Sequence, residues 1–189
     1  MNSSRQQFWI EALKGGTIIG LVSVAFSLVL QFSGESETWV NMLNIASTVV
    51  TILLMAGYLR RFALSHTRAE GFSYGRGVGF VVAMMIFVGI LSGVYSAVMA
   101  NFVIREEVLA SVDQVMAQMQ DMVPAESFES TYDMMRASVT NPLILTLSSV
   151  ISNVFLGLLC GLILSTTTRR QADIFADENT PTTDANNNL

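Results

Sequence analysis

Residues 77–104 contain no charged side chain, and this feature limits the possible folds of the chain more than any other. As a helix, the stretch would extend roughly 42 Å at about 1.5 Å per residue. The hydrocarbon core of a bilayer is about 30 Å thick, so this helix must tilt or project. Apolar residues continue beyond it at helical spacings of three and four, at Ile104, Val108, Val112, Val115, Met119 and Met122. We therefore predict an unbroken helix from about Gly77 to Met122, ahead of a turn at Pro124.

The composition indicates an integral membrane protein. Charged residues make up 13% of the 189 residues, whereas a soluble domain usually has about 25%, and the mean hydropathy is +0.50. We predict an all-α, polytopic membrane protein with four transmembrane helices, over residues 16–32, 39–59, 77–104 and 142–165. The first stretch is not followed by an A-x-A cleavage pattern, so we expect an uncleaved anchor.

These four spans belong to one membrane domain, residues 1–172. Residues 173–189 are rich in Asp, Asn and Thr. They have too little apolar content to fold alone, and we predict a disordered cytoplasmic tail.

Residues 105–141 are predicted to form an extracytoplasmic amphipathic helical hairpin between the third and fourth spans. The returning helix has Phe128, Tyr132, Met135 and Val139 at helical spacing. Asn141 would cap the fourth span, with Pro142 at its first position. We expect the two apolar stripes to face each other. The acidic side chains would then point to water as candidate partner-binding residues: Glu106, Glu107, Asp113, Asp121, Glu129 and Asp133.

The orientation follows from the ten Lys and Arg residues. Eight precede the first span, connect the second to the third or follow the fourth: Arg5, Lys14, Arg60, Arg61, Arg68, Arg76, Arg169 and Arg170. Only Arg105 and Arg136 lie elsewhere, in the hairpin, among seven acidic residues. The positive-inside rule therefore predicts two cytoplasmic termini and a hairpin on the other side of the membrane.

Two patterns within the spans have a functional and a packing interpretation. A polar stripe in the second span, with Asn153 in the fourth, could line a permeation path or form interhelical hydrogen bonds: Asn41, Asn44, Thr48 and Thr51. Because no ionisable residue lies mid-membrane, we favour hydrogen bonding. Small residues four apart could form a homodimer seam or pack one bundle, and we favour packing: Gly16 with Gly20, Gly75 with Gly79, Gly89 with Gly93, and Gly157 with Gly161.

No pattern of catalytic or metal-binding residues stands out. Met116, Met119 and Met122 could bind Cu(I) through their thioethers, but adaptable packing inside the hairpin is the better interpretation. His66 is the one histidine, and neither HExxH nor GxSxG occurs. We expect no enzymatic activity, no cofactor, no metal and no nucleic-acid partner.

The chain resembles a known family. A Gly71-Phe72-Ser73-Tyr74-Gly75 run enters the third span, Ser92-Gly93-Val94-Tyr95 lies in its middle, and a long external insert precedes the fourth. This pattern is similar to the bacterial inner-membrane family named domain of unknown function 4199, over nearly all of the chain except the tail. That family has no established activity, so the resemblance implies no catalytic residue. Its members are often encoded near glycosyltransferases of the polyprenyl-phosphate type, which implies a setting in envelope glycan or lipid assembly.

Two functions remain open from the sequence. The first is a non-enzymatic accessory or scaffold protein, embedded in the lipid bilayer, that presents the hairpin to a protein partner. The alternative is a small transporter or lipid-handling subunit that uses the polar stripe of the second span. A purified protein that moves a solute in liposomes would support the alternative, and a stable partner without transport would support the first.

Overall fold

The structure, a computed structural model, describes residues 3–32, 37–65, 71–119 and 124–168. Its elements are all helices, in the order α1 (Ser3–Phe32), α2 (Glu37–Leu64), α3 (Tyr74–Val98), the π-helix η1 (Met99–Val103), α4 (Arg105–Met119), α5 (Ala125–Thr140) and α6 (Pro142–Thr168). The predicted tail, Asp121, Met122, His66 and the turn after α1 lie outside the described residues.

Four stretches are long and apolar enough to cross a membrane, which confirms the predicted all-α, four-span class: Arg5–Phe32, Glu37–Leu64, Tyr74–Val103 and Pro142–Thr168. The helices extend beyond the predicted spans. The polar residues ahead of the first span are helical, and there Lys14 Nζ lies 3.0 Å from Glu11 Oε1. A spacing of three residues places these two side chains on one helix face.

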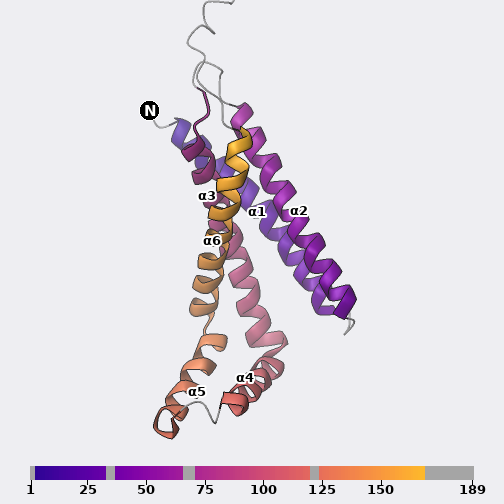
Figure 1. Cartoon of the computed structure of the whole chain (residues 1–189), viewed down its shortest axis with the longest axis vertical. Helices are drawn as coiled ribbons and strands as arrows, with labels where there is room; N and C mark the ends of the chain where they lie inside the picture. Colours follow the sequence, from indigo (N-terminus) through magenta and orange to yellow (C-terminus); the bar gives the residue numbers. More distant parts are fainter. Residues whose placement is uncertain (1–2, 33–36, 66–70, 120–123, 169–189) are drawn as a thin grey trace, which may run out of the picture.

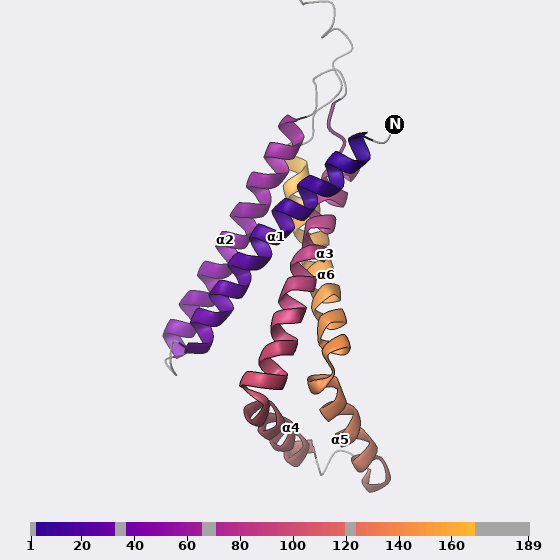
Figure 2. The ribbon, with the colours of Figure 1, turned by 180° about the vertical axis from the view of Figure 1, so that it is seen from behind.

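The four candidate spanning helices converge at one end of the molecule and separate at the other (Figures 1 and 2). We call these the closed end, with the start of α1 and the end of α2, and the open end, with α4 and α5. The buried core lies toward the closed end, where Ile19, Met55, Leu59, Phe80 and Met84 are almost fully buried. Toward the open end, the α1–α2 pair and the α3–α6 pair diverge, so the outer halves of α1 and α2 lie away from α3 and α6.

Glycines set the close approach of α3 to α6, the most extensive helix pair. A Cβ added at Gly89 would lie 2.6 Å from the Cα of Val150, and one at Gly93 would lie 2.6 Å from the Cα of Thr146. Gly16 and Gly20 of α1 similarly meet α3. Three of the four predicted glycine pairs therefore pack one bundle. The fourth pair, Gly75 and Gly79, meets nothing within 4 Å.

The prediction of an unbroken third helix is wrong. Between α3 and α4 the backbone forms η1, in which the Ile104 N–H donates to the Met99 carbonyl, five residues back, at 2.9 Å. Ile104 then leaves helical geometry, with φ −117° and ψ 28°. The Asn101 side chain, within η1, donates to the Ala97 carbonyl at 2.9 Å, so a side-chain hydrogen bond accompanies this change of backbone geometry. As a result, α4 departs from the direction of α3 (Figure 2).

The hairpin prediction is confirmed in its helices and corrected in its packing. Both α4 and α5 form, and they contact each other. The buried residues of α4 are Val112 and Met116, whereas Val115, which we expected to face α5, is 39% exposed. Val112 and Met116 are four residues apart, so the buried line on α4 advances by four residues where we expected a step of three. On α5, the expected residues Phe128, Tyr132, Met135 and Val139 are half-buried.

The cap predicted between α5 and α6 is also confirmed. The Asn141 side-chain oxygen accepts from the Leu143 N–H at 2.9 Å. Pro142 is the first residue of α6, where its missing N–H costs no intrahelical bond. The hairpin is therefore joined to the last span through a defined cap and not through a long linker.

Candidate functional site

Five of the six acidic residues that we predicted to point toward water can be located in the structure. Glu106, Glu107, Asp113, Glu129 and Asp133 are all exposed. The sixth predicted residue, Asp121, is outside the described part of the chain. In that part, no group of three or more His, Cys, Asp or Glu side chains could hold a metal ion. The acidic residues thus form a dispersed charged surface on two helices and not a compact ligand cluster.

One of these residues also joins the two hairpin helices. The Tyr132 hydroxyl on α5 donates a hydrogen bond of 2.7 Å to Asp113 Oδ1 on α4. This bond to a carboxylate raises the pKa of Tyr132, and slight desolvation adds to the effect. The contact is charge-assisted and links residues that are far apart in sequence, so it fixes how α4 and α5 lie against each other.

Glu106 and Glu107 contribute to the start of α4 as well as to the acidic surface. Both lie in the first turn of α4, where a negative charge is favourable because it meets the positive end of the helix dipole. Together with Asn101 and Arg105 they line a polar cavity of about 320 Å³ at the junction of η1 and α4. Phe102 borders the same cavity and is 83% exposed. The junction therefore offers both charged and apolar surface at the open end.

Among the described residues, the polar stripe of α2 shows none of the interhelical hydrogen bonds that we favoured. The Thr48 hydroxyl donates to the Asn44 carbonyl of its own helix at 2.9 Å, and Asn153 donates to the Ser149 carbonyl of α6 at 2.8 Å. Asn41, Asn44 and Thr48 are exposed, and Thr51 is half-buried. Most of these polar side chains are therefore accessible at the surface and are not buried between helices.

The stripe lies on a specific face of α2. Thr48 precedes the buried Met55 by seven residues, and Asn44 precedes it by eleven. Such spacings return to nearly the same side of an α-helix. The face of α2 that enters the core at the closed end is thus the polar face at the open end. It is exposed there because α3 and α6 have diverged from α2 (Figure 1).

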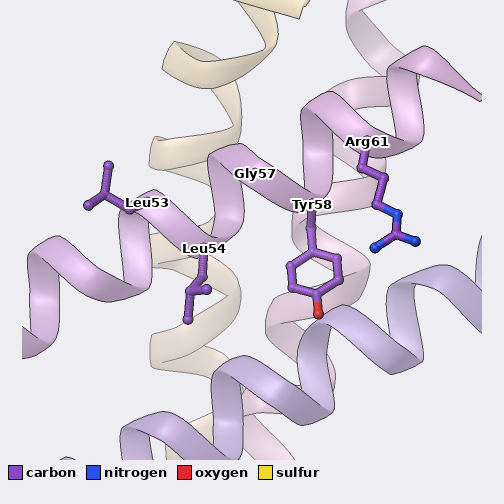
Figure 3. A pocket seen from close by; sticks show the side chains of 5 residues that line it. All are labelled: Leu53, Leu54, Gly57, Tyr58 and Arg61. Atoms are coloured by element: carbon purple, nitrogen blue, oxygen red, sulfur yellow. The ribbon is translucent and has the colours of Figure 1, made fainter.

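A pocket near the closed end of α2 was missed by the sequence analysis. It has a volume of about 250 Å³ and is lined by Leu53, Leu54, Gly57, Tyr58 and Arg61 (Figure 3). A Cβ added at Gly57 would meet nothing within 4 Å, so this glycine leaves open space on the helix surface. The sequence signal was present as a glycine followed by Tyr and Arg at the end of an apolar run.

The Tyr58 ring is one wall of this pocket and also a contact between helices. A Cβ added at Gly15 of α1 would lie 3.2 Å from Tyr58 Cγ, so the ring lies directly over that glycine. Arg61 is exposed and, within the described residues, has no carboxylate partner. The pocket therefore combines an aromatic wall, an apolar floor and a guanidinium that has no carboxylate partner among the described residues.

Comparison with known proteins identifies a family. The family model described as "Protein of unknown function (DUF4199)" matches residues 14–170. This confirms the family resemblance seen in the sequence. No curated protein matches the chain, and no solved structure matches it.

Proposed function

We propose, for a chain that belongs to the family of unknown function DUF4199, a non-enzymatic accessory or scaffold role in a membrane. The protein presents the α4–α5 hairpin to a protein partner. The closed end faces the cytoplasm, and the hairpin lies on the other side of the inner membrane. Among the described residues, the basic side chains outside the hairpin lie on α1, near the end of α2 and near the start of α3, and basic segments stay in the cytoplasm.

The observation that carries this proposal is the incomplete burial of an ordered hairpin. The apolar side chains of Val115 on α4 and Met134 on α5 are 39% and 71% exposed. The packing of the two helices against each other therefore leaves apolar surface uncovered. A link between α3 and α6 requires only a short turn. A pair of helices with uncovered apolar side chains is a surface suited to a partner.

The charge of the hairpin indicates the chemistry of that partner. The two helices that carry these apolar residues also carry five exposed carboxylates, namely Glu106, Glu107, Asp113, Glu129 and Asp133. Complementary charge guides association and excludes like-charged surfaces. We therefore propose a partner whose contacting surface carries Lys or Arg around an apolar centre.

Photo-crosslinking in native membranes tests this function. Benzoylphenylalanine replaces Val115 or Met134 in the full chain, and Ile163 of α6, which is 70% exposed, is the matched control position. We expect both hairpin positions to crosslink to the same protein and Ile163 to crosslink to none. Glu129→Lys with Asp133→Lys should weaken the crosslinks. Crosslinks that involve lipid alone at both hairpin positions would overturn the proposal.

Deletion of residues 106–139, bridged by a flexible linker, gives a second test. The shortened chain should insert normally but lose the crosslinked partner and fail to complement a knockout. Full complementation would show that the hairpin is dispensable.

A second candidate, a transporter or lipid-handling subunit, is favoured by the exposed polar face of α2. If water or a polar solute occupies this face, a Thr48→Cys variant in a Cys160→Ser background should react with a water-soluble thiol reagent. Ile45, which is 66% exposed, gives the matched control Ile45→Cys. Selective reaction of Thr48→Cys together with solute uptake into liposomes would favour transport, and equal protection of both sites would exclude it.

A further inference from the structure

We propose that the pocket on α2 binds one anionic phospholipid of the leaflet at the closed end. Arg61 holds the phosphate, and an acyl chain follows Leu53, Leu54 and Gly57 toward the membrane centre. This site is independent of the hairpin and of the function proposed for it.

The order of residues along α2 matches the order of groups in a lipid (Figure 3). Leu53, Gly57 and Arg61 are four residues apart and share one face, with Leu54 and Tyr58 beside them. From Leu53 to Arg61 the helix rises about 12 Å. The surface thus changes from apolar to cationic in the direction from the membrane centre to its surface.

Arg61 has the properties of a phosphate ligand. It is exposed in the last turn of α2 and, among the described residues, no carboxylate neutralises it. A guanidinium can donate two parallel hydrogen bonds to phosphate oxygens, which an ammonium cannot do in the same fixed geometry. Basic pockets at this membrane depth are a known form of anionic-lipid recognition.

Gly57 and Tyr58 define the path of the lipid acyl chain on α2. The open space at Gly57 provides a shallow recess, and the Tyr58 ring, held against Gly15, forms its side. Leu53 at the inner end is 65% exposed, so apolar surface there faces the hydrocarbon. The pocket of about 250 Å³ is smaller than sites for drug-sized soluble ligands, which range from about 300 to 1,000 Å³. It fits a headgroup with the first part of one chain.

The chain provides matched controls for both parts of the site. Arg60 is the preceding residue, is also exposed and does not line the pocket. Arg60→Gln and Arg61→Gln thus change the net charge equally. Gly79 of α3 is exposed with nothing within 4 Å of an added Cβ, as at Gly57. Gly79→Leu is therefore the control for Gly57→Leu, which fills the recess.

The test is native mass spectrometry of the full chain in detergent, titrated with phosphatidylglycerol or with phosphatidylcholine of the same acyl chains. We expect one tightly retained phosphatidylglycerol and weaker binding of phosphatidylcholine. Arg61→Gln and Gly57→Leu should each weaken phosphatidylglycerol binding about tenfold, whereas Arg60→Gln and Gly79→Leu should not. Thermal unfolding of each variant, compared with the wild type, verifies the fold.

Three results would overturn the proposal. If Arg60→Gln and Arg61→Gln weakened phosphatidylglycerol binding equally, the binding would depend on general surface charge and not on this pocket. If Gly57→Leu left phosphatidylglycerol binding unchanged, the lipid would bind at another place on the protein. Displacement of the lipid by millimolar inorganic phosphate would show a site for a free anion and not for a lipid.

Discussion

At the scale of single residues, glycines at similar positions in the helices differ in what surrounds them. Gly89 and Gly93 lie against the backbone of α6, where neighbouring atoms cannot rotate away. Gly79 on the same helix meets open space. The sequence shows both as small residues four apart, and only the three-dimensional neighbours distinguish them. The same distinction identified Gly57 as part of a pocket.

Gly89→Ala should destabilise the protein by about 1–3 kcal/mol, because the new methyl group would force α3 away from the Val150 backbone. Gly79→Ala should be neutral or slightly stabilising, because alanine lowers the backbone entropy cost of a helix by about 0.5–1 kcal/mol. Thermal unfolding in detergent measures both changes. Equal stability of the two variants would contradict the packing of α3 on α6.

The Tyr132 phenol gives a prediction about pH. Its pKa is raised above the usual 10.0, first by the hydrogen bond to Asp113. Because the folded hairpin favours the protonated phenol, the stabilisation is fully present below pH 10.0 and is lost as pH rises through the folded pKa. Asp113→Asn should lower the Tyr132 pKa, and Glu129→Gln should leave it nearly unchanged. Titration of ¹³Cζ-labelled tyrosine by NMR measures this, and an unchanged pKa in Asp113→Asn would exclude the bond.

At the scale of elements, the helix boundary marked by capping residues was predictable from the sequence, and the π-helix was not. Asn141 and Pro142 mark the start of α6 in the sequence because cap chemistry is local. The π-helix η1 contains Asn101, whose side-chain amide bonds to a backbone carbonyl in an otherwise apolar stretch. Nothing in the apolar period distinguishes Asn101 from a polar residue in a continuous helix, so the expected 77–122 helix was wrong.

Deletion of Phe102 should remove the bend between α3 and α4. A π-helix accommodates one extra residue within an α-helix, and removing that residue restores four-residue hydrogen bonds. Spin labels at Val94→Cys and Gln118→Cys, in a Cys160→Ser background, should then move apart toward roughly 35 Å, the length of a straight helix at about 1.5 Å per residue. Phe102→Ala keeps the residue count and should keep the shorter distance. If the deletion leaves the distance unchanged, η1 is not the cause of the bend.

At the scale of the whole molecule, the sequence predicted the number of spans but not their arrangement. Apolar length and the absence of charge are sufficient to count four spanning helices. The divergence of the α1–α2 pair from the α3–α6 pair depends on where small and large side chains meet between helices. The exposure of the acidic residues on the hairpin could be predicted from the sequence alone. The exposure of the polar face of α2 and the pocket at Arg61 could be found only in the structure, because both depend on how the helices are arranged.

The whole-molecule prediction concerns orientation. Ser127 lies in the hairpin and Ser65 lies at the closed end, and both are exposed. Single Ser127→Cys and Ser65→Cys variants are made in a Cys160→Ser background and treated with a membrane-impermeant thiol reagent. In intact cells only Ser127→Cys should react, because eight of the ten Lys and Arg residues lie outside the hairpin and basic segments stay in the cytoplasm.

After permeabilisation both variants should react, which controls for accessibility of each thiol. Labelling of Ser65→Cys alone in intact cells would reverse the topology. The hairpin would then face the cytoplasm, and the lipid pocket at Arg61 would lie in the outer leaflet. Anionic phospholipid is concentrated on the cytoplasmic side. A reversed orientation would therefore weaken the case for an anionic occupant as well, so this one experiment bears on both ends of the molecule.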